Sequence, residues 1–268
     1  MKLSVFYDHI LSAAKQRSLP VSHVLTLARR MGYSMVELDY VNLSDEVFSL
    51  LKAADMGVAS LYGFFRFDTE PQRDRISAHI ETAVRCGVKR IMPIPGFFSG
   101  CAEKREEEFS RMLEGMKELT ERAHRAGLTV TIEDFDNVGS PIRDSAGMNA
   151  FITRLPHLYA TFDTGNFRLA GENALSAFES LKPRIAHVHL KDRSLSSEFG
   201  AHTLTAMDGT ALHPCPVGGG FIPMEKIFAA LREIGYDGVL SVEHFGADDQ
   251  LLCMEQSAQY IRRFFEFD

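Results

Sequence analysis

The sequence predicts an α/β protein with a (β/α)8 barrel, and three observations lead to this fold class. Short apolar segments typical of strands alternate with amphipathic segments typical of helices along the chain, without a linker or a change in composition. The alternation repeats about eight times, and a length of 268 residues is common for such a barrel. Several strand candidates also end in polar side chains, which is where barrels place their functional groups. We therefore expect one barrel domain over residues 1–268.

The first half of the chain supplies four strand and helix units in regular order. Glu37 and Asp39 share one face of the second strand candidate, but no motif singles them out. The turn after the first strand lacks a glycine-rich phosphate loop, which argues against the main alternative, a doubly wound open sheet. The expected strands cover residues 3–7, 35–39, 58–62 and 88–94, and the expected helices cover residues 20–31, 45–54, 71–86 and 103–125.

The second half continues this order but contains one long irregular segment, residues 193–221. Loops of this length in compact domains are usually functional lids or disordered, so we expect no regular structure there. A helix is expected to follow from residue 223. The expected strands cover residues 129–133, 159–163, 184–192 and 239–243, and the expected helices cover residues 146–155, 174–181, 223–234 and 248–265.

Composition excludes some classes of function. A formal net charge of -7 argues against a protein that mainly grips a nucleic-acid backbone. The N-terminal strand reaches Asp8 before a signal-peptide apolar region forms, and no later segment is long enough to span a bilayer. We expect a cytoplasmic protein that binds neither nucleic acid nor membrane. Its cysteines form no Cys-x-x-Cys pair and are expected to be free thiols in a reducing compartment: Cys86, Cys101, Cys215 and Cys253.

Four strand candidates carry chemistry at their ends. Alternation along residues 184–192 puts His187, His189 and Lys191 on one face and apolar residues on the other. Three further strands each end in a carboxylate that follows a small hydroxyl residue by two positions. Parallel strands would deliver these groups to one rim and form an oxygen-rich site for a divalent metal. Ordinary salt bridges at the rim are the alternative, which the equal parity on successive strands disfavours. The four candidate ligands are Glu133, Asp163, His189 and Glu243.

A series of motifs then occurs in one order: Ile-Glu-Asp, Phe-Asp-Thr-Gly-Asn-Phe, His-Val-His-Leu-Lys-Asp, Pro-Val-Gly-Gly-Gly and Gly-Tyr-Asp-Gly-Val-Leu-Ser-Val-Glu. In this order and spacing they resemble the xylose-isomerase-like TIM barrel superfamily. That superfamily includes sugar phosphate isomerases and epimerases, ketose 3-epimerases, hydroxypyruvate isomerases, inosose dehydratases and endonuclease IV. The motifs cover the C-terminal half, and the first half matches only in its order of strands and helices.

The resemblance implies a metal cofactor. In that family a Glu, an Asp, a His and a Glu from strands five to eight hold the metal, and these correspond to the same four residues that alternation selects. Three carboxylates and one imidazole suit Mn²⁺ best, with Mg²⁺, Co²⁺ and Zn²⁺ as alternatives. We therefore expect one divalent metal ion at Glu133, Asp163, His189 and Glu243.

The same set of residues suggests a reaction. A bound metal would polarise the carbonyl of a hydroxy-ketone and stabilise the enediolate that forms when the neighbouring carbon loses a proton. Glu133 and Glu243, on opposite sides of the metal, would act as the catalytic pair that removes and returns the proton, which gives epimerisation. If one base serves both steps, aldose-ketose isomerisation results. We expect an isomerase or epimerase whose small-molecule substrate is a sugar, sugar phosphate or keto-sugar.

Further residues are expected to contact the substrate. In His-x-His the second histidine is the family's ligand, so His187 is left to face the substrate or to orient a neighbour. Asn166 stands where some members carry a histidine, and it either binds substrate or caps the following segment. For Lys191 and Arg193, a solvated position at the rim is the alternative to binding phosphate or hydroxyl groups. The expected substrate contacts are therefore His187, Asn166, Lys191 and Arg193.

Other functions stay open. A lyase or dehydratase acting on a keto-cyclitol or keto-sugar, like inosose dehydratase, would use the same proton abstraction with a different placement of the acid. A carbohydrate-binding protein without turnover is disfavoured by the paired glutamates. An endonuclease IV-like phosphodiesterase is disfavoured by the acidic charge and by the lack of further histidines near strands three and four. The sequence does not choose the sugar, and the resemblance allows a homo-oligomer.

Overall fold

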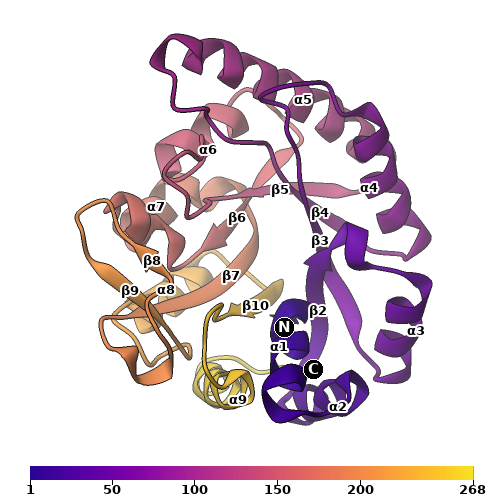
Figure 1. Cartoon of the computed structure of the whole chain (residues 1–268), viewed down its shortest axis with the longest axis vertical. Coiled ribbons are helices and arrows are strands. Elements are labelled where there is room, and N and C mark those ends of the chain that lie inside the picture. The colour runs from indigo at the N-terminus through magenta and orange to yellow at the C-terminus, as the bar shows by residue number, and fades with distance from the viewer. Residues whose placement is uncertain (268) are drawn as a thin grey trace.

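The computed structural model describes residues 1–267, and it is a closed parallel barrel surrounded by helices (Figure 1). Neighbouring strands pair in the order β10-β1-β2-β3-β4-β5-β6-β7, and a further pairing of β10 with β7 closes the barrel. The predicted (β/α)8 TIM barrel is confirmed. The barrel strands are β1 (Lys2–Phe6), β2 (Tyr33–Asp39), β3 (Gly57–Phe64), β4 (Arg90–Ile94), β5 (Thr129–Glu133), β6 (Leu158–Asp163), β7 (Ile185–Ser194) and β10 (Val239–Glu243).

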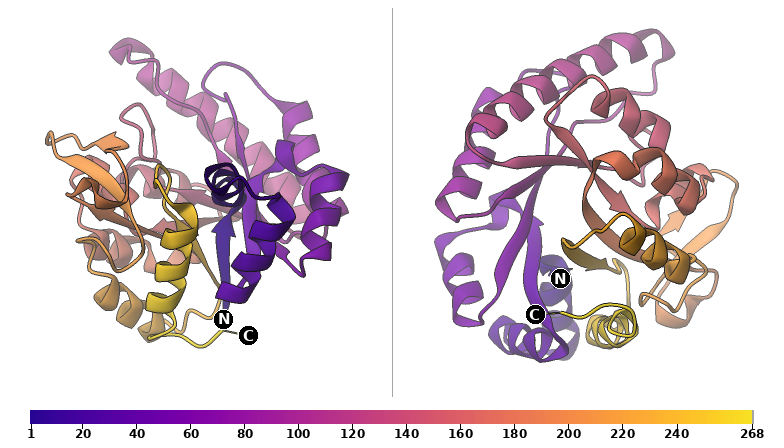
Figure 2. Two further views of the ribbon diagram at one scale, coloured as in Figure 1. Left: turned by 60° about the horizontal axis from the view of Figure 1, so that its bottom comes forward. Right: turned by 180° about the vertical axis from the view of Figure 1, so that it is seen from behind.

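The helices cover the outer face of the barrel, as the view from behind shows (Figure 2). Along β7, Val188 and Leu190 belong to the apolar core, whereas His187 and His189 bond to side chains from other barrel strands. The alternation read from the sequence thus separates a helix-facing side from a site-facing side. The helices are α1 (Tyr7–Arg17), α2 (Val21–Met31), α3 (Asp45–Ala53), α4 (Arg73–Arg85), α5 (Arg105–Arg125), α6 (Ser145–Ile152), α7 (Ala174–Leu181), α8 (Met224–Glu233) and α9 (Gln250–Ile261).

Most of the predicted elements are confirmed to within a few residues. Strands β5 and β10 and helix α7 begin and end at the predicted residues. Local signals account for several of these boundaries. The hydroxyl of Ser44 accepts a hydrogen bond of 3.2 Å from the backbone N–H of Val47 at the start of α3. Gly32, with a φ of 97°, ends α2 in the left-handed conformation that glycine adopts without strain.

Helix α1 was missed, and the prediction that Tyr7 belongs to the first strand is wrong. The helix begins at Tyr7, directly after β1 and without a side-chain cap, so no turn residue separates the two elements. Its buried side is short and contains two alanines, and polar residues occupy much of the rest. The apolar face of α1 is weak and begins within the segment predicted as a strand, so the sequence shows little of the helical periodicity that would indicate this helix. The helix ends at Arg17 and is capped by Ser18, whose φ is 51°.

The segment 193–221 is not irregular throughout, which corrects the prediction. It contains β8 (Leu204–Thr205) and β9 (Ala211–Cys215), which pair with each other in an antiparallel hairpin. Strand β9 also pairs with the extended end of β7, where Asp192 lies opposite Cys215. Both strands of the hairpin are short and β9 contains Pro214, which lowers the strand signal in the sequence. In Figure 1 this hairpin lies outside the closed barrel, beside the end of β7.

The Asp192 carboxylate fixes the glycine-rich end of this segment. Its Oδ2 accepts hydrogen bonds from the backbone N–H groups of Gly218 and Gly220 at 2.9 and 3.1 Å, and its Oδ1 accepts one from Ile222 at 3.1 Å. A Cβ atom on Gly220 would lie 2.2 Å from Asp192 Oδ1, so only glycine lets the backbone approach so closely.

Replacing Asp192 by alanine is therefore expected to loosen this segment. Four backbone donors, the three above and the N–H of Arg193, would lose their acceptor, and we expect the free energy of unfolding to fall by about 2 kcal/mol. Urea unfolding measures the loss, and hydrogen exchange should show faster exchange at residues 218, 220 and 222. Asp237→Ala, which removes an exposed carboxylate, is the matched control. Unchanged exchange at the three amides would contradict this account of the loop.

The structure also bears on two expectations about the whole chain. The four cysteines are free, as predicted, and Cys215 and Cys253 are buried. Within residues 1–267, no helix combines the length and the apolar character that crossing a bilayer requires.

Candidate metal centre and active-site cavity

The candidate site lies where the last four barrel strands end. Parallel pairing puts Asp163 on β6 beside His189 on β7, and Ser241, two residues before Glu243 on β10, beside His189 from the other side. Glu133 is the last residue of β5. The three carboxylates and the imidazole each offer a ligand atom, and these four atoms lie within 4.8 Å of one another in a buried cluster. The structure thus brings together all four residues predicted to be metal ligands: Glu133, Asp163, His189 and Glu243.

The imidazole of His189 turns its two nitrogens to different partners. Its Nδ1 lies 2.5 Å from Glu133 Oε1 and 4.0 Å from Glu243 Oε2, so this nitrogen faces the carboxylate cluster. Its Nε2 lies 3.2 Å from Glu37 Oε2, on the other side of the ring. The edge-on ring of Phe6, with its centroid 5.1 Å away, packs against the same imidazole.

Asp163 offers one oxygen to the backbone and one to the cluster. Its Oδ1 accepts hydrogen bonds of 2.7 Å from the backbone N–H groups of Gly165 and Asn166. Its Oδ2 is buried and has no hydrogen-bond partner among the described residues. A buried carboxylate oxygen without a donor costs free energy unless a cation binds it. Because the other donors are two carboxylates and an imidazole, the group fits a divalent cation that prefers oxygen ligands.

Lys191 reaches into the same cluster. Its ammonium forms an ion pair with Glu243, donates a hydrogen bond of 2.7 Å to Asn166 Oδ1 and lies 3.9 Å from Asp163 Oδ2. Burial alone would lower the pKa of Lys191, but Glu243, Asp163 and Asp136 hold that pKa above its usual value. The side chain therefore remains a cation and a hydrogen-bond donor, and it is not a base near neutral pH.

Two of the carboxyl groups in the cluster bind protons more tightly than usual. Burial raises the pKa of Glu243 to about 8, and Asp163 and Glu133 add to the effect against the opposing charge of Lys191. Burial likewise raises the pKa of Asp163 to about 6, with Glu133 adding to it and Lys191 opposing it. Crowded carboxylates in a buried site resist carrying several negative charges at once.

A cavity of about 390 Å³ opens above this cluster. One part of its wall is aromatic, and T-shaped contacts join Phe64 and Phe135 and also Phe6 and Phe245. The polar part includes Tyr62, whose hydroxyl donates a hydrogen bond of 2.8 Å to Asp8. Ligand cavities commonly combine an apolar wall with a few convergent polar groups. The aromatic residues that line the cavity are Phe6, Tyr62, Phe64, Phe135 and Phe245.

The predicted substrate contacts fall into two groups. Asn166, Lys191 and Arg193 line the cavity. The alternative of solvated rim charges is wrong, because Lys191 is 5% exposed and Arg193 is 4% exposed. Arg193 is held by Asp136, to whose Oδ2 it donates a hydrogen bond of 2.7 Å. Although burial opposes it, Lys191 and Arg193 hold the pKa of Asp136 below its usual value.

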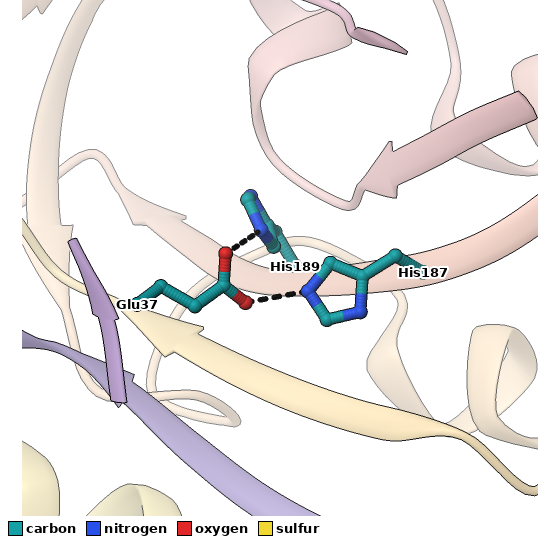
Figure 3. A group of neighbouring side chains, drawn as sticks. All are labelled: Glu37, His187 and His189. Atoms are coloured by element: carbon teal, nitrogen blue, oxygen red, sulfur yellow. Dashed lines mark hydrogen bonds and ion pairs between the residues drawn. The ribbon is translucent and has the colours of Figure 1, made fainter. Parts of the chain in front are cut away.

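His187 lies elsewhere and is not among the described residues that line the cavity. It is fully buried inside the barrel, and its Nε2 lies 2.5 Å from Glu37 Oε1 (Figure 3). Of the two roles open to His187, the geometry favours orienting a neighbour over facing the substrate. Sequence analysis did not assign Glu37 to the site, although its position on the polar face of β2 was a usable signal. Asp8 in the first turn of α1, Tyr62 in β3 and Asp136 in the loop after β5 were missed as well, because no motif marks them.

Sequence comparisons connect this chain to one family. The family model for the xylose isomerase-like TIM barrel matches residues 25–264. Inosose dehydratase from Lacticaseibacillus casei is 28% identical over 144 residues, which cover 52% of this chain and 47% of that protein. Inosose dehydratase from Clostridium perfringens (strain 13 / Type A) is 27% identical over 212 residues, which cover 72% and 71%. The chain spans about half the length of the first of these curated relatives.

Solved structures share the fold. The probable 3-DHS dehydratase AsbF from Bacillus anthracis superimposes with a TM-score of 0.74 at 15% identity, covering 98% of this chain and 99% of that chain. An L-ribulose 3-epimerase gives a TM-score of 0.74 at 18% identity, with 98% and 94% covered. The IolI protein with a bound zinc atom gives 0.71 at 18% identity, with 100% of both chains covered. The resemblance drawn from the sequence motifs is confirmed, and the chain belongs to the xylose isomerase-like TIM barrel family.

Proposed function

We propose that this protein is a divalent-metal-dependent sugar isomerase or epimerase that removes a proton from the carbon next to a carbonyl. The observation that carries the proposal is the buried group of three carboxylates and one imidazole beneath a cavity with an aromatic wall. Glu133, Asp163, His189 and Glu243 would hold the metal, with Mn²⁺ as the expected ion. When bound there, it would polarise the substrate carbonyl and offset the negative charge that develops on its oxygen.

Glu133 and Glu243 are the proposed catalytic residues. Both line the cavity, and they come from β5 and β10, with β6 and β7 between them. Carboxylates that approach a substrate from two sides can remove a proton from one face and return it to the other. Burial raises the pKa of Glu243 to about 8 in the metal-free protein, and a bound metal would lower that pKa and leave the carboxylate that acts as the base.

Lys191, Asn166 and Arg193 are the proposed substrate contacts. The Lys191 ammonium lies beside Glu243, and Asn166 Oδ1 accepts its hydrogen bond, so both side chains present polar groups next to the proposed base. The Arg193 guanidinium donates to Asp136 and lines the same wall. Fixed donors of this kind orient hydroxyl groups without having to reorganise when substrate binds.

The charges around the cavity favour an uncharged substrate over a phosphorylated one. Within residues 1–267, the cations that line it are Lys191 and Arg193, and both are already paired with carboxylates. A phosphate group would meet an excess of negative charge, and it would have to break these pairs to be bound. The aromatic wall suits the C–H face of a sugar or cyclitol ring. The lining carboxylates are Asp8, Glu133, Asp136 and Glu243.

A dehydratase acting on a keto-cyclitol or keto-sugar is the second candidate. It is favoured by the curated relatives, which are named inosose dehydratase. Both candidates begin with the same removal of a proton.

Proton exchange in D₂O tests the proposal. The protein, loaded with Mg²⁺ to avoid paramagnetic broadening, is incubated with neutral ketoses, keto-cyclitols and a ketose phosphate, and the products are followed by NMR. We expect deuterium to enter the carbon next to the carbonyl of a neutral substrate, and exchange in the phosphorylated analogue to be at least about tenfold slower. The product separates epimerase from dehydratase. A metal-loaded protein that exchanges no proton of any substrate would contradict the proposal.

Metal affinity should depend on pH in a defined direction. A protonated carboxyl is a poor ligand, so the metal must displace the protons that Glu243, with a pKa of about 8, and Asp163, with a pKa of about 6, hold in the metal-free protein. The metal must also displace the proton on His189 Nδ1, because, although burial opposes it, Glu133 and Glu37 hold the pKa of His189 well above its usual value. We expect the association constant for Mn²⁺ to rise about a hundredfold per pH unit between about pH 6 and 8, with two protons released. Calorimetry in buffers of different ionisation enthalpy measures both quantities. An affinity independent of pH in this range would be inconsistent with these carboxyls as ligands.

A further inference from the structure

Glu37 is a buried carboxylate beneath the candidate metal centre, and it holds three donors. Its Oε1 lies 2.5 Å from His187 Nε2 and accepts a hydrogen bond from the Ser241 hydroxyl, and its Oε2 lies 3.2 Å from His189 Nε2. Figure 3 shows the Glu37 side chain reaching from its own strand to both histidines of β7. Glu37, His187 and Ser241 are absent from the described cavity lining, so they meet the substrate only through other residues.

Stability alone does not account for this arrangement. Glu37, His187 and Ser241 are each 0% exposed. Burying an ionised carboxylate costs several kcal/mol, and apolar side chains of similar size would fill the same space at no such cost. Both oxygens of Glu37 accept hydrogen bonds, Oε1 from His187 and Ser241 and Oε2 from His189, so the group acts as a carboxylate acceptor.

We propose that Glu37 is a positioning residue that fixes the tautomer and the orientation of His189. A carboxylate at His189 Nε2 keeps a proton on that nitrogen, so the proton that Nδ1 shares with Glu133 in the metal-free protein is the one that metal binding would displace. Nδ1 would then turn its lone pair to the metal. The inference rests on the proposed function, because it assigns Nδ1 as the atom that binds the metal. It goes beyond that function by giving a role to three residues that contact neither metal nor substrate.

His187 and Ser241 have a defined part in this arrangement. Both donate to Oε1 of Glu37, so they hold the carboxylate in one rotamer and leave Oε2 for His189. Ser241 pairs directly with His189 in the register of β10 and β7, so the backbone sets its distance from the ring. His187 therefore orients His189 indirectly, by holding the Glu37 carboxylate in the layer of the barrel below the cavity.

A second metal ion between Glu37, His187 and His189 is the competing interpretation, since their ligand atoms also lie within 4.8 Å of one another. The contacts at 2.5 and 3.2 Å are already hydrogen bonds between the three side chains. An ion at His189 Nε2 would remove the proton that the proposal requires. The number of metal ions bound per chain therefore distinguishes the two interpretations.

The test measures metal binding and not only activity. Mn²⁺ affinity is determined by calorimetry for the wild-type protein, for Glu37→Gln and for Tyr33→Phe. Tyr33 is the matched control, because it lies on the same strand and its buried hydroxyl donates to the backbone oxygen of Met254, away from the cluster. We expect one ion per wild-type chain, a dissociation constant about 10- to 100-fold higher in Glu37→Gln, and a change of less than about twofold in Tyr33→Phe.

A second measurement reads the tautomer of His189 in the wild-type protein itself. In wild-type protein with ¹⁵N-labelled histidine and bound Zn²⁺, the His189 resonances, assigned by their loss in His189→Asn, should show a protonated Nε2 and a metal-bound Nδ1. The reverse tautomer, two ions per chain, or an unchanged affinity in folded Glu37→Gln would each overturn the proposal. If the wild-type protein binds no metal, both the proposed function and the role of Glu37 fail. If wild type and Glu37→Gln bind the metal equally, only the role of Glu37 fails.

Discussion

Replacing Glu243 by glutamine is expected to slow the exchange of the substrate's proton for deuterium by about a thousandfold, which is within the range that a positioned general base contributes. The carboxamide keeps the size of the side chain but cannot accept a proton near neutral pH. Glu243 lines the cavity, and a bound metal would keep the wild-type group in the carboxylate form that accepts the substrate's proton. NMR in D₂O with saturating Mg²⁺ measures the rate.

Because Glu243 is also a proposed ligand, its two roles must be separated. The amount of metal bound by Glu243→Gln is measured by equilibrium dialysis at the concentration used in the assay, and the rate is compared at equal occupancy. Glu255→Gln, an exposed change on α9, is the control and should retain the wild-type rate. Wild-type exchange by a fully loaded Glu243→Gln would show that the base is another group.

Replacing Lys191 by methionine is expected to lower the free energy of unfolding of the metal-free protein by about 3 kcal/mol at pH 8. The change keeps the length of the side chain and removes the cation that pairs with Glu243 and lies near Asp163 and Asp136. Their charges would then be buried without compensation. Urea unfolding measures the loss, and Lys182→Met, which removes an exposed ion pair on the surface, should change stability by less than about 0.5 kcal/mol.

The loss should shrink as the pH falls. The raised pKa values of Glu243 and Asp163 mean that the folded protein binds more protons than the unfolded chain between about pH 4 and 8. Stability therefore decreases as the pH rises through this range, and it increases when the carboxyls are protonated. Removing Lys191 raises the pKa of these carboxyls further, so the variant should depend on pH more steeply than the wild type. A loss that is equal at pH 6 and pH 8 would contradict the electrostatic explanation.

The second half of the barrel was predictable because its signals are local. In β5, β6, β7 and β10, alternation within a few residues separates the polar face from the apolar face, and each carboxylate stands at the end of its strand. Parallel pairing then leaves little freedom in where these ends meet. The grouping of Glu133, Asp163, His189 and Glu243 follows from these facts before any coordinates are known.

The contribution of Glu37 was not predictable in the same way. Its partners His187 and His189 are about 150 positions away in the sequence, and the pairing of β1 with β2 contains an irregularity in register that alternation does not reveal. The burial of Lys191 and Arg193 likewise depends on contacts made by Asp136 and Thr203, which come from loops. Contacts made by loop residues have no periodicity in the sequence. The sequence therefore indicated Lys191 and Arg193 as site residues but not the contacts that bury them.

The ammonium of Lys191 among the carboxylates has a consequence for how the protein matures. A chain that carries its own cation at the proposed centre does not need a metal ion to offset those charges while it folds. Folding would then precede metal loading, and the ion that occupies the proposed centre would be the one available when the folded protein meets it. Supply in the cell, as well as the ligands, would determine which metal this protein carries.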